Sequence, residues 1–182
     1  MTSPKVSETL ALLGGPKAVT TDCADLFRWP IVTAEDEQAV LDVLRAGSMS
    51  DADVTRSFEA EYAAYQGCTH ALGFPNGTSA LLAAMYGCGV RRSDEIICPS
   101  LTYWASALPV FSLGATVVFA DVEPDSICLD PNDIEHRITP RTKAIVVVHY
   151  CGHPADMDPI VEIARKHGIK VIEDVSHAHG GL

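Results

Sequence analysis

Hydrophobic and polar residues alternate in a regular way from residue 70 onward. Short apolar, β-branched runs predict strands at 70–74, 95–98, 116–120, 144–149 and 170–173. Longer stretches with apolar residues at helical spacing predict helices at 79–86, 104–113, 132–138 and 159–167. Glycine and proline separate the two kinds of segment. Because strands and helices alternate, we expect an α/β fold: right-handed βαβ units that form a mostly parallel sheet with flanking helices.

The part of the chain before residue 70 has a different pattern. Residues 1–30 are expected to form an irregular segment, because glycines and prolines interrupt any long element. Two helices are expected next, at 34–46 and 55–66, and Thr33 is suited to cap the first of them. We therefore expect one domain, residues 31–182, behind an irregular N-terminal segment.

Composition narrows the class of protein. Hydrophobic residues make up 47% of the 182 residues and charged residues 20%, which is typical of a globular protein. The net charge of −11 argues against a nucleic-acid partner, since phosphate neutralisation needs clustered Lys and Arg. No apolar run approaches the roughly 20 residues of a membrane span. The six cysteines are scattered without a CxxC pair, so we expect reduced thiols, a cytoplasmic location and no metal site.

The ends of the predicted strands offer candidate binding residues, because ligands of open α/β sheets lie outside the carboxyl ends of the strands. After the first strand, Gly77 turns the chain, and Thr78 and Ser79 open a helix. Free N–H groups at a helix start, together with two hydroxyls, favour a bound phosphate. The alternative is that Thr78 merely caps the helix.

Aromatic residues follow the second predicted strand. Tyr103 and Trp104 come shortly after its end. An aromatic side chain in this place can stack on a planar cofactor ring. The alternative is that both side chains pack into the core.

Carboxylates and histidines follow the last predicted strand. Asp174 stands where the strand ends, and a buried carboxylate persists only with a partner. A protonated pyridine nitrogen is a suitable partner, since the pair keeps the ring an electron sink. His177 and His179 are possible metal ligands, but no third ligand has convincing spacing. His149, at another strand end, is either a further candidate or a core histidine.

A phosphate loop, an aromatic residue and a strand-end Asp, in this order, form the layout of a fold-type I pyridoxal 5'-phosphate (PLP) enzyme. The chain resembles the DegT/StrS family of PLP-dependent sugar and cyclitol aminotransferases. The resemblance covers nearly the whole chain from about residue 13. The segments that carry it are WPIVTAEDEQAVLDVLRAGSMS (29–50), NGTSA (76–80), DEIICPSLTYWASA (94–107), LGATVVFADVEPDS (113–126), TPRTKAIVVVHYCGHPADMD (139–158) and KVIEDVSHAHGG (170–181).

The resemblance implies a function and a set of site residues. The family's cofactor-binding positions correspond here to Gly77, Thr78, Ser79, Tyr103, Asp174 and His177. The first three would bind the phosphate, Tyr103 would stack on the ring, Asp174 would pair with the pyridine nitrogen, and His177 would lie near the 3-hydroxyl. The implied protein is a cytoplasmic homodimer that transfers an amino group from glutamate or glutamine to a keto sugar or cyclitol. The histidine at 177 and the segment GGPKAV (14–19) resemble the cyclitol and aminohydroxybenzoate-synthase side of the family.

The resemblance also implies a lysine that binds PLP covalently, downstream of the last shared segment. The chain's lysines are Lys5, Lys17, Lys143, Lys166 and Lys170, and none has that context. We therefore expect a truncated large domain, without the small C-terminal domain and without the catalytic lysine, which leaves open whether it is an enzyme. Two alternatives are an inactive PLP-fold fragment or split-gene partner, and a PLP-dependent sugar dehydratase-like protein.

Overall fold

The computed structural model describes residues 9–23, 28–47 and 53–181. The chain divides into two units, Met1–Asp51 and Ala52–Leu182. In the first unit, the helix α1 spans Ala34–Ala46, as predicted. Thr33 and Asp36 form a capping box at its start: the Asp36 N–H donates to the Thr33 hydroxyl, and the Thr33 N–H donates to the Asp36 carboxylate. The local sequence alone therefore determines where this helix begins.

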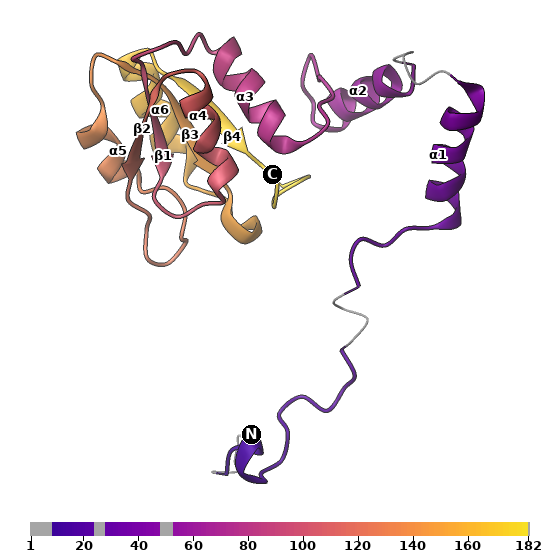
Figure 1. Ribbon diagram of the computed structural model, residues 1–182. Helices are drawn as coiled ribbons and strands as arrows, with labels where there is room; N and C mark the ends of the chain where they lie inside the picture. The colour runs from indigo at the N-terminus through magenta and orange to yellow at the C-terminus, as the bar shows by residue number, and fades with distance from the viewer. Residues whose placement is uncertain (1–8, 24–27, 48–52, 182) are drawn as a thin grey trace. The chain divides into compact units, whose positions relative to one another are not determined.

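The second unit contains one parallel sheet of four strands (Figure 1). The strands are β1 (Glu95–Pro99), β2 (Thr116–Ala120), β3 (Thr142–Val148) and β4 (Lys170–Asp174). Their order in the sheet is β2-β1-β3-β4. The parallel α/β sheet is thus confirmed. Because all four strands run the same way, their carboxyl ends share one edge of the sheet.

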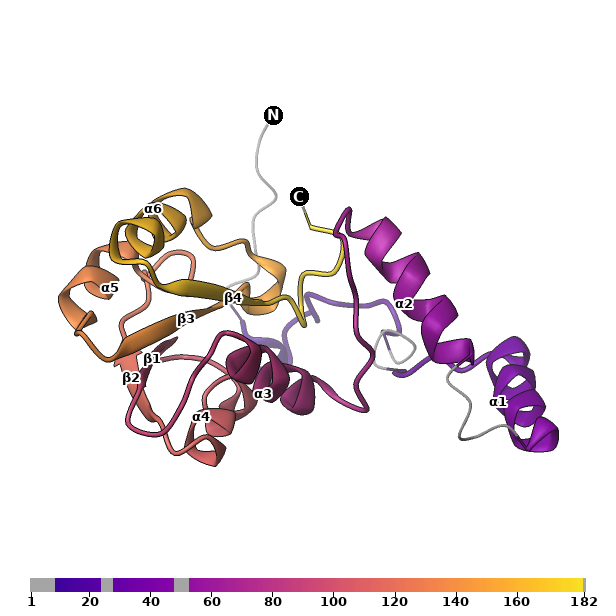
Figure 2. The same ribbon diagram turned by 90° about the horizontal axis from the view of Figure 1, so that it is seen from above.

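Helices cover both faces of this sheet. They are α3 (Gly77–Gly87), α4 (Leu108–Ser112), α5 (Pro131–Arg137) and α6 (Met157–His167); α2 (Asp53–Tyr65) precedes them. Figure 2 shows α3 and α4 on one side of the sheet, with α5 and α6 on the other. Side chains along β3 alternate between the two sides: Val146 packs in one core with Met85, and Val147 packs in the other core with Ile160. Burial on both sides explains the continuous apolar run of this strand.

Two predicted elements differ in the structure. Residues 70–74 do not form a strand, and within the described residues no neighbouring segment supplies the ladder that a strand requires. The predicted helix at 104–113 is broken into a 3-10 turn, Trp104–Ser106, and the short helix α4. Pro109 lies in the first turn of α4, where its missing N–H is tolerated, and a longer helix through it would lose a hydrogen bond.

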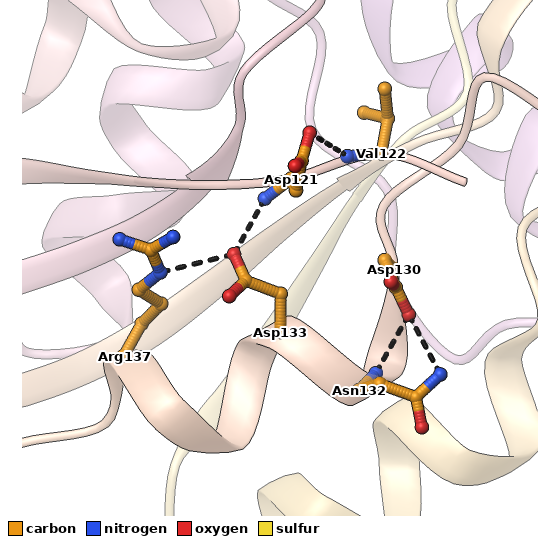
Figure 3. A network of polar contacts seen from close by, with 6 residues as sticks. All are labelled: Asp121, Val122, Asp130, Asn132, Asp133 and Arg137. Atoms are coloured by element: carbon orange, nitrogen blue, oxygen red, sulfur yellow. Dashed lines mark hydrogen bonds and ion pairs between the residues drawn. The ribbon is translucent and has the colours of Figure 1, made fainter. Parts of the chain in front are cut away.

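A polar network joins α5 to the end of β2 (Figure 3). The Asp133 carboxylate accepts hydrogen bonds from the Asp121 N–H at 2.8 Å and from Arg137 Nε at 3.0 Å. These contacts lower the pKa of Asp133, and the Asp121 N–H is the largest cause. Asp130 caps the same helix by accepting from the Asn132 N–H at 2.8 Å. The loop between β2 and α5 is therefore fixed at both of its ends.

The opposite edge of the sheet, where the strands begin, also carries a buried carboxylate. Glu95 accepts hydrogen bonds from the Thr139 hydroxyl and from Arg141. The Thr139 contact is the main cause that lowers the pKa of Glu95. This cluster stabilises the edge of the sheet that lies away from the strands' carboxyl ends.

Among the described helices, none is long and apolar enough to cross a membrane.

Candidate functional site

A pocket with a volume of about 200 Å³ lies at the carboxyl ends of the strands. Five of the six residues expected to bind a cofactor line it: Gly77, Thr78, Tyr103, Asp174 and His177. The sixth, Ser79, follows them on α3 and does not line this pocket. The fold thus brings residues that are up to 100 positions apart in the sequence to one place.

One side of the pocket is the start of α3. The helix is capped by Asn76, whose Oδ1 accepts from the Ser79 N–H at 2.9 Å, so the alternative that Thr78 is the cap is wrong. Within the described residues, the N–H groups of Gly77 and Thr78 have no acceptor. A Cβ built on Gly77 would meet no atom within 4 Å, so open space lies beside it. Free donors, open space and the positive end of an eleven-residue helix suit a bound phosphate.

Asp174, the last residue of β4, faces the pocket from another side. Its Oδ2 accepts from the Ser106 hydroxyl at 2.8 Å, and its Oδ1 accepts from the N–H and hydroxyl of Ser176. No lysine or arginine in the described part of the chain forms an ion pair with it. An ionised carboxylate has about four acceptor positions, so it can accept one more hydrogen bond. A cationic N–H from a ligand, such as a pyridinium nitrogen, fits this carboxylate.

His177 has one ring nitrogen engaged. Its Nδ1 accepts from the Cys151 N–H at 3.2 Å, so in the neutral ring Nε2 carries the proton and can donate. The ring also contacts Tyr150 edge to face, with centroids 6.1 Å apart. Both residues line the pocket. The free Nε2–H suits a ligand oxygen such as a ring hydroxyl.

The two aromatic residues after β1 are not part of the core. Tyr103 is 64% exposed and Trp104 is 57% exposed, so the core alternative is wrong. Their ring centroids are 5.6 Å apart. Tyr103 lines the pocket, whereas Trp104 does not. Of these two residues, Tyr103 is therefore the one placed to stack on a planar ligand bound there.

The other two candidate histidines, His149 and His179, have partners within the protein. His149 is buried, with Nδ1 accepting from the Ala155 N–H and Nε2 3.1 Å from Glu173, which makes it a core histidine. His179 Nδ1 lies 2.9 Å from the Tyr62 hydroxyl on α2. Among the described residues, no group of three or more His, Cys, Asp or Glu is arranged to hold a metal.

Lysine side chains are absent from the residues that line the pocket. Lys143 and Lys170 lie near the starts of β3 and β4, whereas the pocket lies at the ends of these strands. Lys166 pairs with Glu135. Lys5 lies outside the described residues. The lysines of the second unit therefore have no direct route to the pocket.

Four further lining residues with hydroxyl groups were not singled out from the sequence: Thr102, Ser106, Tyr150 and Ser176. Ser106 was hidden inside a predicted continuous helix, and Pro109 was the available signal that this helix is broken. Ser176 could have been noticed, because a serine two residues after an aspartate commonly bonds to it. Nothing in the sequence pattern distinguished Thr102 or Tyr150.

The fold and the pocket define a class: a parallel α/β domain whose pocket is lined by unbonded helix N–H groups, an exposed aromatic and a carboxylate that can accept one more hydrogen bond. The DegT/DnrJ/EryC1/StrS aminotransferase family model matches residues 30–181, and the chain belongs to this family. The predicted family is thereby confirmed, and the fold is that of the large domain of fold-type I PLP-dependent aminotransferases.

Two curated relatives come from Streptomyces. The dTDP-3-amino-3,4,6-trideoxy-alpha-D-glucose transaminase of Streptomyces venezuelae is 45% identical over 81% of this chain and 39% of its own length. The L-glutamine:2-deoxy-scyllo-inosose aminotransferase of Streptomyces lividus is 39% identical over 96% of this chain and 42% of its own length. The chain therefore spans about two fifths of the length of these relatives.

Solved structures agree with this family. The 3-amino-5-hydroxybenzoic acid synthase structure matches with a TM-score of 0.79 and 37% identity, over 84% of this chain and 40% of that one. A protein from Streptococcus pneumoniae, described as a sugar aminotransferase and solved in its PLP form, matches with a TM-score of 0.77 and 26% identity, over 82% of this chain and 42% of that one. Sugar, cyclitol and aminohydroxybenzoate enzymes are thus all among the similar proteins.

Proposed function

We propose that this chain holds PLP, or its amino form pyridoxamine 5'-phosphate, as part of an aminotransferase for a keto sugar or cyclitol. The observation that carries the proposal is that free N–H groups at the start of α3 and the carboxylate of Asp174, which can accept one more hydrogen bond, lie in one pocket. A phosphate and a pyridinium nitrogen are the two ends of this cofactor, and each end has a matching group here. When bound, PLP supplies an electron sink for the carbon that carries the amino group.

In this proposal, the start of α3 binds the phosphate. The N–H groups of Gly77 and Thr78 donate to phosphate oxygens, and the Thr78 hydroxyl adds a third donor. Ser79 does not line the pocket and its own N–H is already bonded to Asn76, so a contact of its hydroxyl with the phosphate stays a prediction. By holding the phosphate, the start of α3 would fix one end of the cofactor and limit rotation of its ring.

The remaining site residues orient the ring. Asp174 accepts a hydrogen bond from the protonated pyridine nitrogen and keeps the proton there. Tyr103 holds the ring plane by stacking, and His177 donates from Nε2 to the 3-oxygen. These contacts differ at the two ends of the cofactor, so they would hold it in one orientation in the pocket.

The relatives support a choice of substrates. Glutamine is named in the 2-deoxy-scyllo-inosose aminotransferase, and a sugar nucleotide is named in the transaminase. We propose glutamine or glutamate as the donor and a keto sugar or cyclitol as the acceptor. The protein is proposed to act as a homodimer in the cytoplasm, and its six free cysteines fit that location. Because no lysine lines the pocket, this chain is proposed to hold the cofactor without a covalent bond.

Calorimetric titration of the 182-residue chain with pyridoxamine 5'-phosphate tests the proposal. The wild-type chain is expected to bind, and Thr78→Val is expected to weaken binding about tenfold, because one hydrogen bond to a charged group is lost. Thr116→Val is the matched control: it makes the same change on an exposed residue at the start of β2 and should bind like the wild type. No binding by the wild-type chain, or equal affinity of all three proteins, would contradict the proposed function.

A further inference from the structure

Ser106 is a buried serine whose hydroxyl contacts the Asp174 carboxylate, and the two residues lie on different elements. It ends the 3-10 turn after β1 and is 1% exposed. Its hydroxyl donates to Asp174 Oδ2 at 2.8 Å, across 68 positions in the sequence. A buried hydroxyl with a single strong acceptor has few alternative orientations.

The direction of this hydrogen bond follows from the carboxylate, which only accepts when it is ionised, and a third residue extends the chain. The Thr102 hydroxyl donates to Ser106 Oγ at 2.9 Å. A hydroxyl has one proton to donate, so Ser106 accepts from Thr102 and gives its own proton to Asp174. The three groups form a chain in which each bond strengthens the next. Cys98 adds only a weak contact, from its sulfur to the Ser106 carbonyl at 3.7 Å.

The two oxygens of Asp174 are held in different ways. Oδ1 is bonded to Ser176, two residues further along the same segment, which moves together with Asp174. Oδ2 is bonded to Ser106, which belongs to the segment after β1. Among the described residues, Ser106 is thus the side chain that ties the carboxylate to the segment after β1, a strand separated from β4 by β3. Without it, the contacts that remain on the carboxylate within the described residues come only from Ser176, on the same segment as Asp174.

We propose that Ser106, supported by Thr102, is a positioning residue that holds the Asp174 carboxylate in the orientation that meets a protonated ring nitrogen. The proposal rests on the proposed function, since it concerns the same pocket. It assigns Ser106 no contact with the cofactor. Its effect passes through Asp174 to the proton on the ring nitrogen.

The test uses pyridoxamine 5'-phosphate labelled with ¹⁵N in the ring, bound to the 182-residue chain and followed by NMR as the pH is raised. The ¹⁵N chemical shift reports whether the ring nitrogen is protonated. For Ser106→Ala we expect the pKa of the bound ring nitrogen to fall by about one unit, a tenfold loss of proton affinity, because the ion pair is no longer aligned. Ser106→Thr keeps the hydroxyl and should restore the wild-type value.

Matched variants separate this effect from a loss of folding. Ser100→Ala makes the same change on an exposed serine directly after β1 and should leave the ¹⁵N titration unchanged. Thr102→Val leaves Ser106 in place but removes the hydrogen bond that the Ser106 oxygen accepts. A smaller fall of the ring-nitrogen pKa in the same direction is therefore expected. This second variant keeps the test decisive if Ser106→Ala does not fold.

The outcomes distinguish the two proposals. If the wild-type chain binds the cofactor but Ser106→Ala and Thr102→Val both titrate like wild type, the positioning role is wrong and the proposed function stands. If the wild-type chain does not bind the cofactor, the proposed function fails, and the role of Ser106 fails with it. A fall that also occurs in Ser100→Ala would overturn the specific role of Ser106.

Discussion

Single residues of one type have very different surroundings in this fold, and the cysteines illustrate this. Cys98 lies in the core at β1, where burial raises the pKa of its thiol to about 12. Cys68 and Cys151 are exposed. Thiolates, not thiols, are the reactive form, so reactivity should follow burial.

We therefore expect iodoacetamide at pH 8 to alkylate Cys68 and Cys151 in the folded chain and to leave Cys98 unmodified. In denaturant, all three should react at similar rates. Peptide mass spectrometry after timed labelling measures each site. Equal labelling of Cys98 and Cys151 in the native chain would show that β1 is not buried as described.

The residue scale also shows what the sequence allows one to predict about the site. Asp174 could be found because it follows a buried apolar run, and Thr78 because it follows a turn glycine. Each signal is local. Ser106 could not be found this way, since its importance comes from a contact 68 positions away, and its own neighbourhood looked like an ordinary helix.

Elements with strong local signals begin and end where the sequence predicts. Thr33 caps α1 at the predicted residue, and β2 has the predicted bounds. The segment 70–74 has a strand-like composition but no strand ladder, because a strand depends on a partner that local sequence does not specify. Helix α4 is shorter than the helix predicted at 104–113, because Pro109 has no N–H to donate and a longer helix through it would lose a hydrogen bond.

The polar network at α5 leads to a prediction about acid stability at the scale of one element (Figure 3). The folded-state pKa of Asp133 is depressed, first by the Asp121 N–H and then by Arg137. A depressed pKa means that the contribution to folding stability is present above the unfolded value, near 3.8, and is lost as the pH falls through the folded value.

Asp133→Asn should therefore destabilise the chain at pH 7 and lose less stability than wild type between pH 4 and pH 2, because it has no carboxylate to protonate. Urea denaturation at several pH values measures this difference. Asp125→Asn, an exposed aspartate in the loop before α5, is the control and should follow the wild-type pH dependence. If the free energies of unfolding of wild type and Asp133→Asn fall in parallel as the pH is lowered, the network is contradicted.

At the scale of the whole second unit, the parallel sheet followed from alternation along the sequence, but the strand order did not. The order β2-β1-β3-β4 places β1 and β3 side by side in the centre. The alternation of strands and helices along the sequence predicts only that the strands are parallel, and several strand orders are compatible with it. This order is what brings Tyr103, after β1, to the same pocket as Asp174, at the end of β4.

The same order explains why the site is built from several loops. The start of α3 gives N–H donors, the segment after β1 gives an aromatic ring and hydroxyls, and the end of β4 gives a carboxylate. The sheet holds these loops in place, so the pocket does not depend on any one of them being rigid by itself. The central claim is that the start of α3 is the phosphate end of this pocket.

The most direct test of that claim is an amide NMR titration of the ¹⁵N-labelled 182-residue chain with pyridoxamine 5'-phosphate. The N–H groups of Gly77 and Thr78 have no acceptor in the described residues, so a bound phosphate should shift their resonances more than any others. Inorganic phosphate should move the same two signals at higher concentration. If these two resonances stay in place while the chain binds the cofactor, or if the largest changes fall elsewhere, the site described here is wrong.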